Sequence, residues 1–224
     1  MNADLARLIA LARQPSPWDV GNEALYRLCR EHPRHTDIGA IVAKVWLIGR
    51  SYAAAIERGR RTIKDQPNDA FYVDNMAPKI RNSEIDNWLS EAREAVSTEA
   101  AQMATILKCH RSIIELFRKF SRHDNRSLAS KYLHFHVPDL FFIYDSRAVE
   151  AMGLLKPVVG RASSPIGDVD YEYGKFVEKC IRLRRCIKEE SDHVLSCREL
   201  DNFLLRVHFE KSAGLPWSTA SKLV

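Results

Sequence analysis

An aspartate that follows a short apolar run is the first residue whose setting in this sequence suits chemistry. Asp145 comes directly after Phe142–Tyr144 and precedes Ser146–Glu150, a stretch with helical character. A carboxylate at this place would lie at a helix N-terminus, where backbone N–H groups and the helix dipole stabilise its charge. An ordinary N-cap aspartate is the alternative interpretation, and the residues around Asp145 leave both open.

Two histidines nearby raise the question of a metal site. His134 and His136 are two positions apart in a segment with helical periodicity. On a helix, side chains at this spacing point about 200° away from each other, so they cannot easily share a metal ion. A third ligand at a standard spacing is missing, and so are a nucleophile elbow and the glycine loops of nucleotide-binding folds. We therefore expect neither a metal nor another cofactor.

Helical periodicity dominates the elements that must position these residues, and it predicts an all-α fold of about nine or ten helices. The one ambiguous stretch is Leu140–Tyr144, which is too short to establish a strand. A first helix should end before Pro15. The longer helices that follow are expected at about residues 17–31, 37–59, 83–96, 98–121, 127–135, 145–152, 171–188 and 200–211.

Three local signals refine these helices. Ser16 followed by Pro17 is typical of an N-cap with proline at the first helical position. Ser196 and Glu199 have the spacing of a capping box for the last helix. The helix expected over residues 37–59 has apolar residues around most of its circumference, which indicates a central place in its lobe.

The 224 residues, 46% of them hydrophobic and 28% charged, suit one folded domain. We expect a single all-helical domain over residues 1–224. One possible organisation of this domain is two lobes with a cleft between them. No apolar run is long enough to span a bilayer, and the first residues lack the features of a secretory signal. The five cysteines contain no C-x-x-C pair, which favours buried thiols in a reducing compartment. These features predict a cytoplasmic protein without a membrane partner.

A mild excess of positive charge permits an anionic partner. Lysine and arginine number 34 against 29 acidic residues, a formal net charge of +5. The charge is concentrated in clusters that could contact phosphates, although solvated helix faces are the alternative for each cluster. The basic residues of the main clusters are Arg58, Arg60, Arg61 and Lys64; Arg111, Arg118, Lys119 and Arg122; and Lys179, Arg182, Arg184, Arg185 and Lys188.

Residues 120–155 resemble the helix-hairpin-helix DNA glycosylase superfamily. In that superfamily a glycine-rich hairpin leads into a helix, and an apolar stretch then ends at a catalytic aspartate, which Asp145 matches. Ala129 matches the small residue near the start of the helix. The chain departs from the pattern at Arg122–Arg126, where the hairpin glycines are missing, and Asn125 could supply a left-handed turn residue instead. Ser127 stands 18 positions before Asp145, where lyase members have a lysine, so we expect no lyase chemistry.

The resemblance implies a nucleic-acid-binding protein, and specifically a monofunctional glycosylase that excises a damaged or modified base from duplex DNA. In this reading Asp145 stabilises the developing oxocarbenium ion or positions a water once the base leaves the stack. The residues expected to hold the base or a nearby phosphate are Lys131, His134, Tyr144 and Arg147, and those expected at the nucleic-acid backbone are Arg122 and Arg126. The alternative is a non-catalytic, all-helical binding protein in which Asp145 is only a cap.

Overall fold

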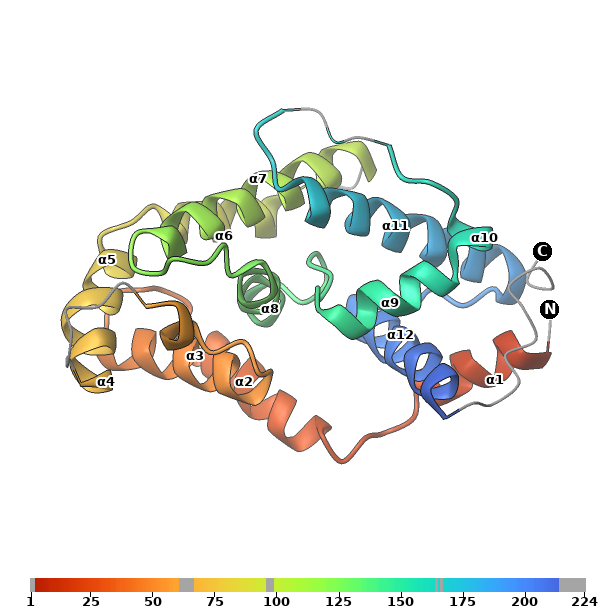
Figure 1. The fold of residues 1–224 in the computed structure, drawn as a ribbon, viewed down its shortest axis with the longest axis horizontal. Helices are drawn as coiled ribbons and strands as arrows, with labels where there is room; N and C mark the ends of the chain where they lie inside the picture. Colours follow the sequence, from red (N-terminus) through yellow and green to blue (C-terminus); the bar gives the residue numbers. More distant parts are fainter. Residues whose placement is uncertain (1–2, 61–66, 96–98, 164, 166, 214–224) are drawn as a thin grey trace. The chain divides into compact units, whose positions relative to one another are not determined.

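The computed structural model describes residues 3–60, 67–95, 99–163, 165 and 167–213. Within these ranges the regular elements are helices, and the only β-type pairing is an isolated bridge between Arg60 and Ser121 (Figure 1). The all-α prediction is confirmed. The chain divides into two compact units, of which unit 1 comprises residues 1–16 and 142–224 and unit 2 comprises residues 17–141.

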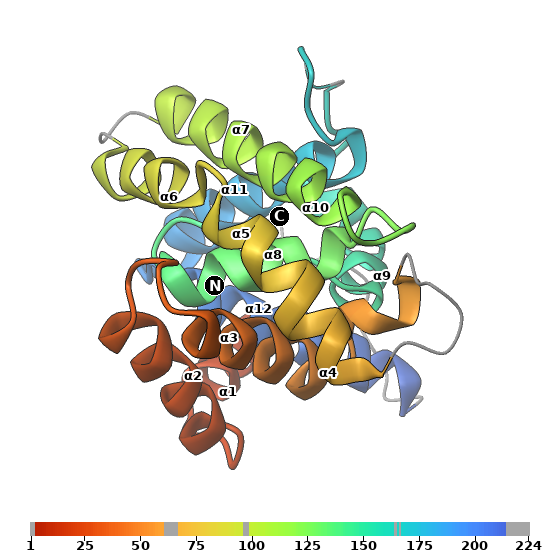
Figure 2. The ribbon, with the colours of Figure 1, turned by 90° about the vertical axis from the view of Figure 1, so that its left-hand side faces the viewer.

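Unit 2 is built around one central helix. Its elements are α2 (Asp19–Glu31), α3 (Ile38–Ser51), the 3-10 helix η1 (Ile56–Gly59), α4 (Asn68–Ala70), the π-helix η2 (Phe71–Met76), α5 (Ala77–Arg81), α6 (Ile85–Glu94), α7 (Glu99–Arg118) and α8 (Arg126–His136). Helix α8 packs against α2 and α3 on one side and α7 on the other (Figures 1 and 2). All nine residues from Leu128 to His136 are therefore buried.

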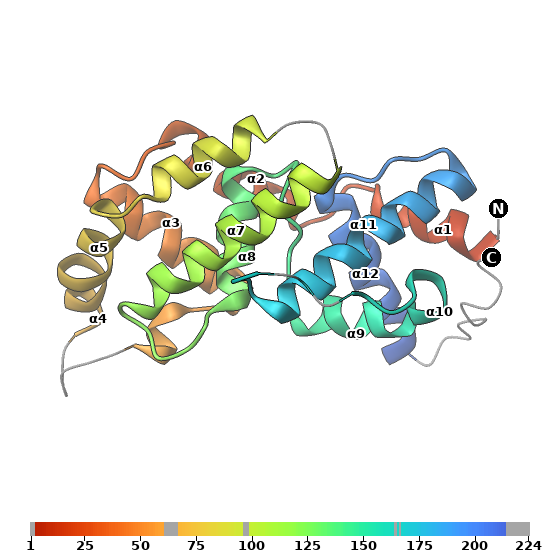
Figure 3. The ribbon, with the colours of Figure 1, turned by 90° about the horizontal axis from the view of Figure 1, so that it is seen from above.

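Unit 1 contains α1 (Ala3–Ala12), α9 (Ser146–Leu154), α10 (Lys156–Val159), α11 (Tyr171–Ser191) and α12 (Cys197–Ser212). Helix α12 lies between α1 and α9 (Figures 1 and 3). The predicted capping box is confirmed, because the Glu199 backbone N–H donates to Ser196 Oγ at 3.1 Å and the Ser196 N–H donates to Glu199 Oε2 at 2.8 Å. No helix in the described parts of the chain is both long and apolar enough to cross a membrane.

Two predicted helix boundaries were wrong. Helix α3 was expected to continue to residue 59, but it ends at Ser51 because Ala53 takes a positive φ of 52°, which no α-helix continues. Apolar residues continue after Ala53, and for that reason the sequence alone predicted a longer helix. Helix α2 begins at Asp19 with Trp18 at the N-cap, two residues after the predicted start at Pro17. The ambiguous stretch at residues 140–144 has no regular secondary structure.

Candidate nucleic-acid interface

A hairpin joins α7 to α8 in unit 2. Asn125, the residue before α8, has φ 47° and ψ 32°, the left-handed conformation that the sequence allowed for it. Its side-chain amide donates to the His123 carbonyl at 2.7 Å, and Arg118 Nε donates to Asp124 Oδ1 at 2.8 Å. The turn is therefore held by side chains, and its left-handed residue is an asparagine.

Two backbone donors of this turn are already occupied inside the protein. The Arg122 N–H donates to the Gly59 carbonyl at 2.6 Å, and the His123 N–H donates to Ser121 Oγ at 3.2 Å. Glycine-rich hairpins contact a phosphate through free backbone N–H groups, and these two groups are not free here. A phosphate bound at this hairpin therefore cannot use these two donors.

The end of η1 holds the hairpin in place. Ser121 Oγ donates to the Gly59 carbonyl at 3.2 Å, next to the bridge between Arg60 and Ser121. The approach is very close: a Cβ atom on Gly59 would lie 2.3 Å from His123 Cδ2 and 2.7 Å from Ser121 Oγ. Only a glycine at this position lets the two segments meet in this way.

We predict that Gly59→Ala lowers the free energy of unfolding by about 1–2 kcal/mol, because the new methyl group must displace the buried Ser121 hydroxyl. Urea denaturation measures the change. Gly21→Ala in α2 is the matched control: nothing lies within 4 Å of the added Cβ. The control should be neutral or stabilise the protein by up to about 1 kcal/mol. Equal effects of the two substitutions would contradict the close packing of Gly59.

The contact through Gly59 brings two basic clusters of the sequence together. Arg58 comes from η1, while Lys119 and Arg122 come from the hairpin, and all three side chains are exposed. No acidic side chain pairs with any of them within the described ranges. We call these three residues the hairpin surface. Lys79 of α5 lies beside it, since its ammonium donates to the Lys119 carbonyl at 3.2 Å.

Other members of the predicted basic clusters are placed differently. Arg118 forms ion pairs with Glu115 at 2.6 Å and Asp124 at 2.7 Å, and Arg111 pairs with Glu115 at 2.9 Å. Arg126 is half-buried at the start of α8, and its carbonyl is 3.2 Å from His110 Nε2. Near η1, Arg60 is half-buried at the bridge to Ser121, while Arg61 and Lys64 lie outside the described residues.

Two of the predicted substrate-binding residues are buried in α8. Lys131 Nζ donates to Ser127 Oγ at 2.7 Å. His134 Nδ1 is 2.8 Å from the Phe141 carbonyl and its Nε2 is 2.6 Å from the Tyr26 hydroxyl. Because a carbonyl only accepts, Nδ1 carries the proton and Nε2 accepts from the tyrosine. Lys131 and His134 would have to leave these partners to touch a substrate, and that role stays a prediction.

The other predicted residues of the catalytic site belong to unit 1. Asp145 is the N-cap of α9 and accepts from the Ala148 N–H at 3.0 Å, as expected for this position. Its second oxygen is 3.7 Å from Arg147 Nη2. Tyr144 is half-buried and makes an edge contact with the ring of Phe176. The structure therefore brings Asp145 and Arg147 together, and it assigns the carboxylate a capping role that is compatible with either interpretation.

The cap gives a prediction for two substitutions at the same position. Asp145→Ala should lower the free energy of unfolding by about 1 kcal/mol, because the Ala148 N–H loses its acceptor. Asp145→Asn should cost less than about 0.5 kcal/mol, since asparagine caps helices almost as well. Urea denaturation of both variants checks this, and equal losses would contradict the cap. Asp145→Asn is thus a suitable variant for activity tests.

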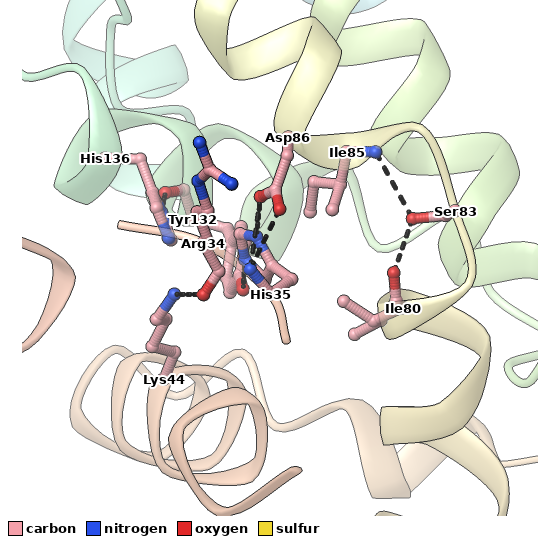
Figure 4. A network of polar contacts seen from close by, with 9 residues as sticks. All are labelled: Arg34, His35, Lys44, Ile80, Ser83, Ile85, Asp86, Tyr132 and His136. Carbon is pink, nitrogen blue, oxygen red and sulfur yellow. Dashed lines mark hydrogen bonds and ion pairs between the residues drawn. The ribbon is translucent and has the colours of Figure 1, made fainter. Parts of the chain in front are cut away.

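A polar cluster inside unit 2 was not found from the sequence (Figure 4). Asp86 Oδ1 lies 2.6 Å from His35 Nδ1, and the His35 backbone N–H donates to both oxygens of the same carboxylate at 3.1 and 3.2 Å. His35 Nε2 accepts from the Tyr132 hydroxyl at 2.7 Å. Burial, followed by the charge of Lys44, lowers the pKa of His35 to about 4, against the raising effect of Asp86. The imidazole is therefore neutral at pH 7.

Lys44 and His136 complete the cluster. Lys44 is fully buried in α3, and its ammonium donates to the Arg34 carbonyl at 3.3 Å. Burial lowers the pKa of this lysine. His136 Nδ1 donates to the Tyr132 carbonyl at 2.7 Å, and its ring stacks on His35 with centroids 5.3 Å apart. Across the described residues, no group of three or more His, Cys, Asp or Glu side chains could hold a metal ion.

One sequence signal could have indicated this cluster. Lys44 stands three residues after Ile41 and four before Ile48, which places the lysine on the buried face of α3. A lysine on such a face needs polar partners inside the protein. The partners themselves come from other segments and have no periodic signature.

A protein-family model matches the larger part of the chain. A family described as an N-terminal domain, HI_0787_N, matches residues 5–140. No curated protein and no solved structure matches the chain. The matched residues make up more than half of the sequence and include both the hairpin surface and the buried cluster around His35. The chain belongs to the HI_0787_N family.

Proposed function

We propose that this protein binds the phosphate backbone of nucleic acid through the hairpin surface. The observation that carries the proposal is the packing of Gly59 against Ser121, which gathers Arg58, Lys119 and Arg122 on one support. Their charges are not neutralised by acids in the described residues. Phosphates in a row are the ligands that such a group of exposed cations suits best.

Binding of this kind depends on charge more than on base sequence. Each lysine or arginine that meets a phosphate releases counterions, so affinity falls as the salt concentration rises. The proposed contacts come from the three exposed side chains, and the Arg122 and His123 N–H groups are engaged within the protein. Long side chains tolerate some variation in phosphate spacing. We therefore expect little discrimination between sequences within a duplex.

A single substitution tests the surface. Arg122→Ala should weaken binding of a labelled duplex of about 20 base pairs by about three- to tenfold at low salt, as measured by fluorescence anisotropy. Lys108→Ala is the matched control: Lys108 lies on the same hairpin helix, α7, is exposed and is paired with Glu91 at 2.7 Å. The control should bind nearly as the wild type does. Equal weakening of both variants would reject the hairpin surface.

A second candidate function is base excision, and the placement of Asp145 favours it. The carboxylate caps α9 directly after an irregular apolar segment, which is the arrangement expected from the glycosylase resemblance. The test measures base release from a panel of damaged and modified duplexes by the wild type and Asp145→Asn. Release by the wild type alone, with equal folding of both proteins by circular dichroism, supports excision. Absence of release by either protein leaves a non-catalytic binding protein as the function.

A further inference from the structure

The buried ammonium of Lys44 lacks an acidic partner. Its side chain is fully buried, and the hydrogen bond it makes within the described residues goes to a backbone carbonyl, that of Arg34 at 3.3 Å. The carboxylate of the cluster, Asp86, is committed to the side chain and backbone of His35. Buried charges in proteins are normally paired, because removing them from water is costly.

His136 presents a second polar group without a partner. Its Nε2 atom is buried and makes no hydrogen bond, while Nδ1 donates to the Tyr132 carbonyl. The residue is 7% exposed. Figure 4 shows this free ring nitrogen directed toward the Lys44 ammonium, with the two side chains coming from α8 and α3. The Nε2 atom of His136 and the ammonium of Lys44 therefore face the same buried position.

The charged groups around this place are the cations Lys44 and Arg93 and the carboxylate of Asp86, while His35 is neutral. After burial, Lys44, His35 and, more weakly, Arg93 of α6 lower the pKa of His136. Asp86 is the acid of the cluster, and it faces His35. The thiol of Cys29 on α2 also lies within the field of Lys44, and burial raises its pKa to about 12, so it stays neutral. A negative ligand would meet net attraction here.

We propose that Lys44 and His136 form a binding site for one small monovalent anion, such as chloride. The ammonium attracts the anion and donates a hydrogen bond to it. His136 takes up one proton from solvent at Nε2, and the resulting N–H donates to the anion while Nδ1 continues to donate to Tyr132. Anion and proton bind together, so the net charge of the site does not change. This inference is independent of the nucleic-acid proposal.

Proton uptake fixes the direction of the pH dependence. Because His136 is neutral without the anion, its protonation accompanies binding, and the anion should bind more tightly at about pH 6 than at about pH 8. The bound anion in turn raises the pKa of His136. Arg93 and His35 oppose this protonation and Asp86 favours it, so affinity depends on all three groups.

Thermal unfolding with chloride exchanged for gluconate at constant ionic strength tests the site. Chloride should raise the unfolding temperature of the wild type in a saturable way, with a larger increase at about pH 6 than at about pH 8. Lys44→Met keeps the length of the side chain and should abolish the effect. Lys108→Met, at an exposed lysine of α7, should retain it.

Crystals soaked in bromide give a second readout that does not require a variant. An anomalous peak between Lys44 Nζ and His136 Nε2 is the expected result. Bromide peaks confined to the protein surface, or a water at this place in bromide, would overturn the proposal. So would a chloride response that is the same in the wild type and Lys44→Met. If Lys44→Met does not fold, the anomalous map alone decides.

Discussion

Reversing all three charges of the hairpin surface should abolish binding of a nucleic-acid duplex. In the variant Arg58→Glu, Lys119→Glu and Arg122→Glu, three attractions to phosphate become three repulsions, and affinity at low salt should fall by more than about 100-fold. The side chains are exposed and without acidic partners in the described residues, so the free energy of unfolding should change by less than about 1 kcal/mol. Fluorescence anisotropy measures affinity, and circular dichroism checks the fold.

The control for this variant has the same change in net charge at other places in unit 2. Arg27, Arg30 and Lys108 are exposed, and each is paired with a glutamate. Their replacement by glutamate should reduce affinity only slightly, through the long-range field of the protein. An equal loss in both triple variants would mean that overall charge, and not the hairpin surface, governs binding.

The second large effect concerns acidification. His35 has a pKa of about 4 in the folded protein against an ordinary value of 6.5. The unfolded chain therefore takes up a proton near pH 6.5 that the folded chain refuses until about pH 4. The contribution of the neutral His35 imidazole to the free energy of unfolding is therefore fully present above pH 6.5. It is lost as the pH falls toward 4, by about 3 kcal/mol in all. Lys44 and Arg93 promote this loss, and Asp86 limits it.

Urea denaturation across this pH range measures the loss. His35→Phe removes the titrating group and should be less stable than the wild type at pH 7, because Asp86 and Tyr132 lose a partner. Its stability should nevertheless fall less steeply on acidification. His193→Ala removes an exposed histidine and should keep the slope of the wild type. A wild-type slope in His35→Phe would contradict the low pKa of His35.

Local features of this fold could be predicted from sequence because they depend on neighbouring residues. The capping box at Ser196 and Glu199 and the N-cap at Asp145 were both confirmed, since each is a contact across three residues. The end of α3 could not be predicted in this way. Its apolar pattern continues beyond Ser51, and no glycine or asparagine marks the left-handed turn at Ala53. The Ala54 N–H donates to the Gly49 carbonyl at 2.8 Å and closes the end of the helix.

The candidate site could be predicted only in part for a related reason. The sequence indicated three basic clusters, but the contact that joins the first two of them links Gly59 to Ser121 across 62 positions. Lys131 and His134 were expected to face a ligand because of the glycosylase resemblance. Helix α8 is packed by α2, α3 and α7, and that packing buries both side chains. Tertiary packing determines exposure in such a helix.

The salt dependence of duplex binding by the wild-type protein tests the central proposal most directly. Three phosphate contacts predict a slope of about −2.7 for the logarithm of the association constant against the logarithm of salt concentration. Affinity should therefore fall by about 40-fold between about 50 and about 200 mM salt. A slope near zero, or no binding at the lowest salt concentration, would contradict the assignment of the hairpin surface to nucleic acid.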